Sequence, residues 1–187
     1  MPCGISLTLI RSRCGCWKNN PRTMSSHLPL PAADARAVDD ALRDTGIDTL
    51  AERRIDSLSG GERMRAHLAR AFAVDAPVLL VDEPVANLDP YHQLSVMQLL
   101  GRYRDQGRLV VAVLHDLNLA LGACTRVLLM DNGAIVADGT PQDVIDESAL
   151  ARHYRIRAHL DAYEGRRFMV PLQTLEANDR DDGRSDE

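Results

Sequence analysis

The sequence predicts an α/β protein whose core is a parallel sheet flanked by helices. Two short stretches, Val78–Val81 and Arg108–Leu114, are nearly unbroken runs of apolar, largely β-branched residues. Such runs are typical of strands that are buried on both faces of a parallel sheet. Pro90–Tyr103 lies between them and has apolar residues at helical spacing, with Leu94 and Leu100 expected on the buried face. Strands that alternate with helices in this way indicate the α/β class.

The composition is that of a globular chain. Of its 187 residues 45% are hydrophobic and 4% are aromatic, and the formal net charge is −5. So few aromatic residues argue against a surface that stacks on nucleic-acid bases, and a negative charge gives no attraction to nucleic acid or to an anionic membrane. No apolar run approaches the ~20 residues of a membrane-spanning helix. We therefore expect one domain with a sizeable core and no nucleic-acid partner.

The segment Ser59-Gly60-Gly61-Glu62 predicts the start of a helix that is suited to bind an anion. A serine followed three residues later by a glutamate is the pattern of a capping box. The two glycines leave the backbone amides of the first turn unshielded by side chains. Unshielded amides with a positive partial charge favour phosphate. An ordinary capped helix that binds nothing is the alternative for these four residues.

Acidic residues and a histidine follow the two predicted strands directly. Ligands of open α/β sheets bind at the carboxyl ends of the strands, where Asp82 and Glu83 are expected. Asp82 can hold Mg²⁺, directly or through water, and Glu83 can orient or deprotonate an attacking water. His115 should lie level with the two acids and could contact a γ-phosphate. A solvated acidic turn and a structural histidine are the alternatives.

Taken in order and spacing, these motifs resemble the nucleotide-binding subunits of ATP-binding-cassette (ABC) transporters. Leu58–Glu62 matches the family signature, and Val78–Glu83 matches the Walker B strand with its catalytic glutamate. Asn87–Asp89 matches the D-loop, and His115 matches the switch histidine. From the residues alone, Asp89 before a proline indicates only a helix N-cap. The resemblance runs from about residue 28 to residue 172.

The resemblance implies a P-loop NTPase-like ABC ATPase core in residues 27–172, with a helical signature subdomain at about residues 32–75. It implies ATP and Mg²⁺ as cofactors. The roles that it implies are catalysis for Glu83 and His115, metal binding for Asp82, and nucleotide contact for Ser59, Gly60, Gly61, Glu62 and Asp89. It also implies a head-to-tail dimer with a second ATPase subunit and permease subunits as partners, at the cytoplasmic face of the cell membrane.

Two further stretches resemble one subgroup of this family, the importers of ferric siderophores, haem and cobalamin. They are Val110–Asn118 and the tail pattern of Tyr154 and Arg155 followed by Arg166–Leu172. The alternatives are a non-transport ABC ATPase of translation or DNA repair, or a non-hydrolytic remnant that completes the ATP site of a partner. A DNA-repair ATPase would carry a long coiled coil and a translation factor usually two cassettes, and the sequence shows no heptad run and one cassette.

One expected motif is missing from the sequence. A domain of this kind needs a Gly-x-x-x-x-Gly-Lys-Ser/Thr loop around the phosphates, but the only lysine is Lys18 and a tryptophan precedes it. We therefore expect a partial, N-terminally truncated ATPase core that lacks the P-loop strand and leaves an apolar strand edge exposed. Residues 1–26 are expected to be unstructured and unlike the family, and residues 173–187 to be a disordered acidic tail. The resulting hypothesis is that this chain does not bind or hydrolyse ATP alone.

Overall fold

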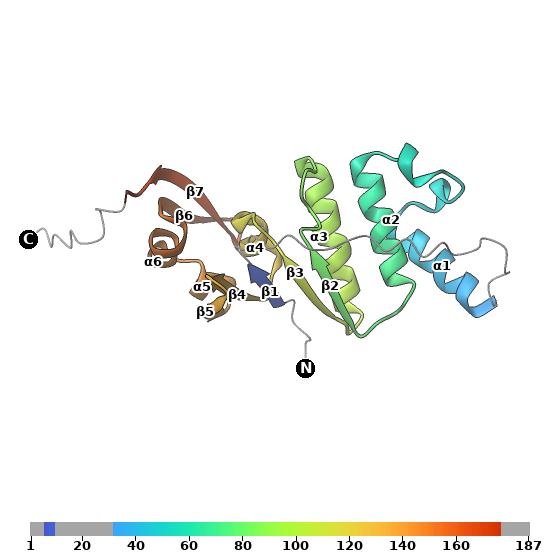
Figure 1. The fold of residues 1–187 in the computed structure, drawn as a ribbon, viewed down its shortest axis with the longest axis horizontal. Helices are drawn as coiled ribbons and strands as arrows, with labels where there is room; N and C mark the ends of the chain where they lie inside the picture. The colour runs from blue at the N-terminus through green and yellow to red at the C-terminus, as the bar shows by residue number, and fades with distance from the viewer. Residues whose placement is uncertain (1–5, 10–31, 177–187) are drawn as a thin grey trace, which may run out of the picture.

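A five-stranded sheet with the strand order β2-β3-β1-β4-β5 forms the centre of the molecule (Figure 1). The computed structural model describes residues 6–9 and 32–176. The strands are β1 (Ser6–Leu9), β2 (Val78–Asp82), β3 (Leu109–Val113), β4 (Arg126–Asp131) and β5 (Ala134–Gly139). The first four run parallel to one another, and β5 returns antiparallel to β4. The parallel sheet and both of the strands on which its prediction rested are confirmed.

Strand β1 corrects the prediction for the start of the chain. Residues 1–26 were expected to form no ordered element, yet Ser6–Leu9 pairs in parallel with β3 on one side and with β4 on the other. The expectation of an unstructured segment, and of an apolar strand edge left open where a central strand was missing, is therefore wrong at these four residues. Four residues are too few to show the alternation of apolar and polar residues that marks a strand. Only the pairing with the two neighbouring strands identifies this one. The rest of residues 1–26 lies outside the described residues.

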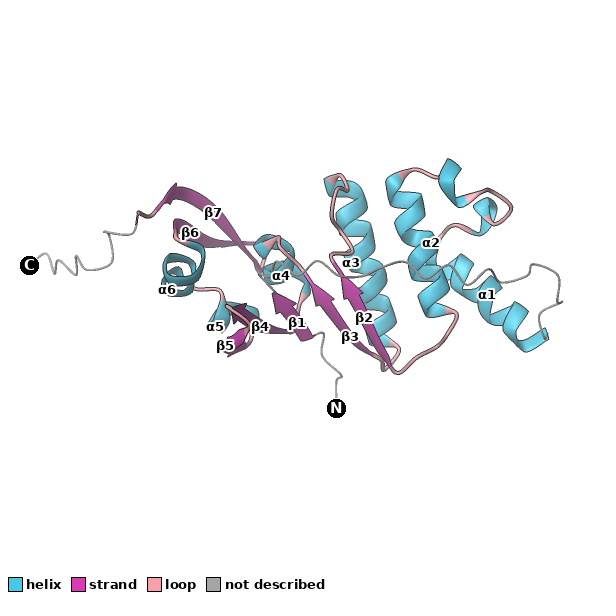
Figure 2. Cartoon of the chain, in the orientation of Figure 1, coloured by secondary structure: helices cyan, strands magenta, loops and turns pink. Residues whose placement is uncertain are grey.

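The helices flank the sheet and extend to one end of the molecule (Figure 2). They are α1 (Ala32–Thr45), α2 (Gly60–Phe72), α3 (Pro90–Asp105), α4 (Leu117–Ala123), α5 (Pro141–Val144) and α6 (Glu147–Ala149), with short 3₁₀ turns at Asp48–Leu50 and Ile55–Ser57 and a π-helical turn at Leu150–Tyr154. Helices α1 and α2 pack against each other beyond α3. No helix in the described part of the chain is long and apolar enough to cross a membrane.

A two-stranded hairpin lies at the opposite end of the molecule from α1 (Figure 1). It consists of β6 (Ile156–Tyr163) and β7 (Arg166–Thr174), joined at Glu164 and Gly165, which both have positive φ. Strand β7 continues two residues into the stretch that was expected to be a disordered tail, and residues 177–187 lie outside the described residues.

The hydrophobic core lies between α3, α4 and one face of the sheet. On α3, Val96 and Leu100 are 1% exposed, and on β3 Val110 and Ala112 are fully buried. The buried residues of β3 alternate with partly exposed ones, as the pleat of a strand requires. Leu94, which the sequence places on the buried face of α3, is instead 51% exposed.

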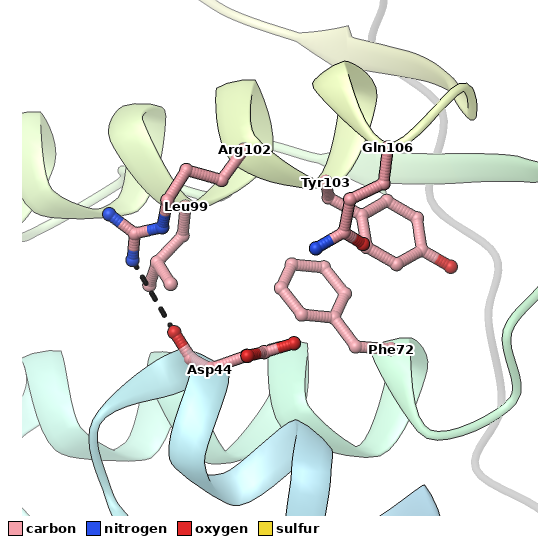
Figure 3. A pocket seen from close by; sticks show the side chains of 6 residues that line it. All are labelled: Asp44, Phe72, Leu99, Arg102, Tyr103 and Gln106. Carbon is pink, nitrogen blue, oxygen red and sulfur yellow. Dashed lines mark hydrogen bonds between the residues drawn. The ribbon is translucent and has the colours of Figure 1, made fainter.

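Stacked aromatic rings join the helical end of the molecule to α3. Phe72 at the end of α2 stacks on Tyr103 of α3, with ring centroids 4.2 Å apart. A small cavity of about 70 Å³ opens beside the rings, and Figure 3 shows the residues that line it: Asp44, Phe72, Leu99, Arg102, Tyr103 and Gln106. Arg102 Nη2 donates to the carbonyl oxygen of Asp44 at 3.3 Å, which ties α1 to α3. No site residue predicted from the sequence lines this cavity.

Burial makes the thiol of Cys124 a sensitive probe of this core. Cys124 follows α4 and is 9% exposed, and burial raises its pKa from 9.0 to about 12. Because the thiolate is the reactive form, we expect iodoacetamide at pH 8 to label Cys124 at least about 100-fold more slowly in the folded chain than in urea. Because the thiol of the unfolded chain ionises near pH 9 and the buried thiol only near pH 12, this group leaves the free energy of unfolding unchanged below about pH 9 and lowers it as the pH rises towards 12. Peptide mass mapping would measure labelling at Cys124, and equal rates in both states would contradict its burial.

Candidate functional site

A cavity of about 160 Å³ opens at the carboxyl ends of β2 and β3. Asp82, the last residue of β2, is in register with Val113, the last residue of β3. The residues that follow these two strands therefore lie side by side. The lining residues are Glu83, Val85, Ala86, Asn87, Gln93, Leu114, His115 and Asp116. The cavity thus brings together Glu83 and His115, which lie 32 residues apart in the sequence.

Glu83 and His115 are in direct contact in this cavity. Glu83 Oε1 lies 2.6 Å from His115 Nε2, and the two side chains are 48% and 60% exposed. Glu83 has a φ of 47°, a left-handed conformation that costs a residue with a side chain roughly 1–2 kcal/mol. Its backbone N–H donates to the carbonyl oxygen of Val113 at 3.2 Å, which helps to hold this conformation. Backbone strain of this kind is common at functional sites.

Asp82 lies at the end of β2 and is exposed. Within residues 6–9 and 32–176, no cluster of three or more His, Cys, Asp or Glu side chains could hold a metal ion. Mg²⁺ does not need such a cluster, because it is often bound by one or two carboxylates together with phosphate oxygens and water. The oxygen ligands at this edge of the sheet therefore fit Mg²⁺ that arrives with a nucleotide.

The start of α2 is a complete capping box, as the sequence predicts. The backbone N–H of Ser59 donates to Glu62 Oε2 at 2.8 Å, and the backbone N–H of Glu62 donates to Ser59 Oγ at 3.3 Å. The N–H of Ser59, and then its hydroxyl, lower the pKa of the Glu62 carboxyl below its usual value. Gly60 is exposed, whereas Gly61 is buried. The first turn of α2 therefore contains one exposed and one buried glycine.

Asp89 caps α3 through one carboxylate oxygen and contacts the side chain of His92 through the other. Oδ1 accepts the backbone N–H of His92 at 3.0 Å, and Oδ2 lies 2.7 Å from His92 Nδ1. The N–H of His92, and then its imidazole, lower the pKa of Asp89. The sequence indicates the cap but not the part played by His92. A histidine three residues after an N-cap aspartate is the only signal that could have pointed to it.

The capping residues of α2 and α3 lie next to each other. A side chain at Gly60 would meet Leu88 Cδ2 at 3.6 Å, and one at Gly61 would overlap the ring of His92. The structure therefore brings the predicted site residues other than Asp82 together in two groups. Ser59–Glu62 and Asp89 form the first group, and Glu83 and His115 form the second. The turn Pro84–Leu88 connects the two groups along the chain.

Asn118 anchors the segment after His115 to the hairpin. Asn118 Nδ2 donates to the carbonyl oxygen of Met169 at 3.1 Å, and the N–H of Met169 donates to Asn118 Oδ1 at 2.7 Å. Asp116 caps α4 by accepting the backbone N–H groups of Asn118 and Leu119. The position of His115 is thus supported from α4 and from β7. The sequence did not single out Asn118 for this contact, because its partner lies 51 residues away.

Comparisons with known proteins agree with this arrangement. The family profile described as ABC transporter matches residues 6–86, so the match begins at β1 and not at about residue 28. The ferric enterobactin transport ATP-binding protein FepC of Escherichia coli (strain K12) is 37% identical over 142 residues, which are 74% of this chain and 52% of that protein. The hemin import ATP-binding protein HmuV of Rhodococcus jostii (strain RHA1) is 40% identical over 138 residues, which are 74% of this chain and 44% of that protein.

The fold is also found among solved structures. An ABC transporter in an inward-facing conformation matches 80% of this chain and 62% of its own chain, with a TM-score of 0.71 and 25% sequence identity. The chain spans about half the length of the curated relatives that it matches. Sequence, fold and the order of the motifs agree, and the chain belongs to the family of ABC transporter ATP-binding domains.

Proposed function

We propose that this chain works as an ATP-binding subunit of an ABC importer, with Glu83 and His115 as its catalytic pair. The observation that carries the proposal is the 2.6 Å contact between Glu83 Oε1 and His115 Nε2 at the carboxyl ends of two parallel strands. A carboxylate at this place can take a proton from an attacking water, and the imidazole beside it can hydrogen-bond a phosphate oxygen. The ATP-binding proteins among its relatives support the choice of nucleotide.

The other site residues take up binding roles in this proposal. Asp82 would hold Mg²⁺ with phosphate oxygens and water. The capped first turn of α2, Ser59–Glu62, would offer the amides that its capping box does not use to the phosphates of a nucleotide that a second subunit holds, and Asp89 would lie beside that contact. Bound MgATP supplies the phosphoanhydride bond whose cleavage drives the transporter. This chain's own part is to bind the phosphates, to orient the water and to accept its proton.

The substrate class that we propose is a metal chelate, namely a ferric siderophore, haem or cobalamin. The relatives reported above are named for the transport of ferric enterobactin and the import of hemin, which supports this class. The partners that we propose are a second ATP-binding subunit in a head-to-tail dimer and permease subunits in the membrane. The chain would then lie at the cytoplasmic face of that membrane, bound through the permease.

We also propose that this chain by itself neither binds nor hydrolyses MgATP. No Gly-x-x-x-x-Gly-Lys-Ser/Thr sequence occurs in the 187 residues, so the lysine and the amide cradle of a phosphate loop have to come from elsewhere. Calorimetric titration of MgATP into the purified chain is expected to show no binding tighter than about 1 mM, which corresponds to only about 4 kcal/mol.

The titration contains its own control. Circular dichroism of the same sample would show whether the chain is folded, and the Glu83→Gln variant should behave like the wild type. Micromolar binding by a folded sample would contradict the proposal that the chain is inactive alone, and another segment would then have to supply the phosphate cradle. That result would leave the importer function standing, because the importer function requires only that the assembled protein turns over ATP.

A further inference from the structure

The ring of His92 lies directly against the backbone of Gly61. A Cβ built on Gly61 would overlap the ring and would lie 2.6 Å from its Cγ, closer than real Cβ atoms approach another heavy atom. Gly61 is buried at this contact although it belongs to the first turn of α2. The glycine in the second position of Gly60-Gly61 is therefore required by the packing of His92, in addition to any need for an unshielded amide.

The imidazole of His92 is held in place on more than one side. Its Nδ1 lies 2.7 Å from Asp89 Oδ2, and its own backbone N–H donates to Asp89 Oδ1. The ring of Tyr91 stands perpendicular to it, with centroids 5.2 Å apart. The side chain is 26% exposed. These contacts restrict the ring, so it cannot simply rotate away from Gly61 as a flexible side chain would.

The start of α2 also makes contacts of its own. The 3₁₀ turn Ile55–Ser57 that precedes it contains no buried residue. Leu58 is buried, and its carbonyl oxygen accepts a hydrogen bond from Arg63 Nη2 of the same helix. Towards α3, the two glycines meet Leu88 and His92, which lie on either side of Asp89. The first turn of α2 and the segment Leu88–His92 are therefore in direct contact.

We propose that His92 is a positioning residue for the amides at the start of α2. Asp89 orients its imidazole, the imidazole supports Gly61, and the contact couples the first turn of α2 to the N-terminus of α3. This inference rests on the proposed function in one respect only, namely that these amides contact the phosphates of a nucleotide. The coupling itself is a property of the chain without nucleotide, so it can be tested separately.

A double-mutant cycle on Gly61 and His92 tests the contact. In the wild-type background Gly61→Ala forces an overlap with the ring and is expected to lower the Tm by about 3–8 °C, the range expected for overpacking in a domain of this size. In the His92→Ala background the overlap is gone, and the same substitution should raise the Tm by about 1–3 °C, because alanine is a better helix former than glycine. The sign of the effect of Gly61→Ala should thus reverse between the two backgrounds. Equal changes in Tm in the two backgrounds would show that the ring of His92 does not pack against Gly61.

Amide chemical shifts test the positioning. In ¹H–¹⁵N spectra of the full chain, His92→Phe, which keeps a ring but removes the hydrogen bond to Asp89, should shift the signals of Gly60 and Gly61. His159→Ala is the matched control, because His159 is 59% exposed and lies 3.7 Å from an aspartate, Asp161, on the hairpin. If the amide signals of Gly60 and Gly61 shift neither in His92→Phe nor in His92→Ala, the proposal is overturned.

These two experiments contain no nucleotide. A chain that fails to turn over ATP could still show the coupling, and an active chain could lack it. The outcome for His92 is therefore separate from the outcome for the importer function.

Discussion

Glu83→Gln is expected to slow ATP turnover by two to four orders of magnitude, the usual contribution of a general base. The carboxylate that faces His115 Nε2 at 2.6 Å would become a neutral amide of nearly the same shape, which cannot accept the proton of an attacking water. Turnover would be measured on the assembly that co-purifies with the tagged chain. Because the amide keeps the shape of the site, nucleotide binding by that assembly should be unchanged, so the loss should fall on kcat.

Glu164→Gln is the matched control for this variant. Glu164 is also a glutamate in the left-handed region, with a φ of 49° against 47° for Glu83, but it lies in the exposed turn of the hairpin. Its substitution should leave turnover within about twofold of the wild type, since exposed positions away from a site seldom matter by more than about 0.5 kcal/mol. Similar turnover in Glu83→Gln and the wild type would show that Glu83 is not the base. A wild-type assembly without any ATP turnover would contradict the importer function itself.

Leu100→Ala is expected to lower the free energy of unfolding by about 3–4 kcal/mol, within the range measured for leucine truncations in well-packed cores. Leu100 is 1% exposed, and the helix that carries it packs on β3. Its removal would leave a cavity between helix and sheet that rigid neighbours can fill only in part. Urea unfolding followed by circular dichroism would measure the change, with an unchanged m value as the sign that the unfolded state is the same.

Leu94→Ala on the same helix is the control. Leu94 is 51% exposed, so its substitution should cost less than about 1 kcal/mol. Equal losses of unfolding free energy in Leu94→Ala and Leu100→Ala would show that α3 does not pack on the sheet through the face that carries Leu100.

The geometry of the site was largely predictable from local patterns. Ser59 and Glu62 interact within one helical turn, so their spacing is enough to predict the capping box that the structure contains. The neighbourhood of Glu83 and His115 follows from a rule of parallel sheets, in which the carboxyl ends of adjacent strands share an edge. The roles of Glu83, His115 and Asp82 stay predictions, because they depend on a nucleotide.

Other contacts between distant segments were decided by the tertiary structure alone. Ser6–Leu9 is a strand because β3 and β4 pair with it on both sides, and no period in four residues could show this. The contact of His92 with Gly61 joins two helix starts 31 residues apart, and the sequence holds no signal for packing between them.

What the sequence determined by itself was therefore local and periodic: the apolar runs, the caps and the acids that follow a strand. Spacing of one turn or one strand dictates these features through backbone hydrogen bonding and burial. Packing between elements that do not share an edge of the sheet depended on the tertiary structure, since side-chain packing across elements depends on shape and not on order in the chain.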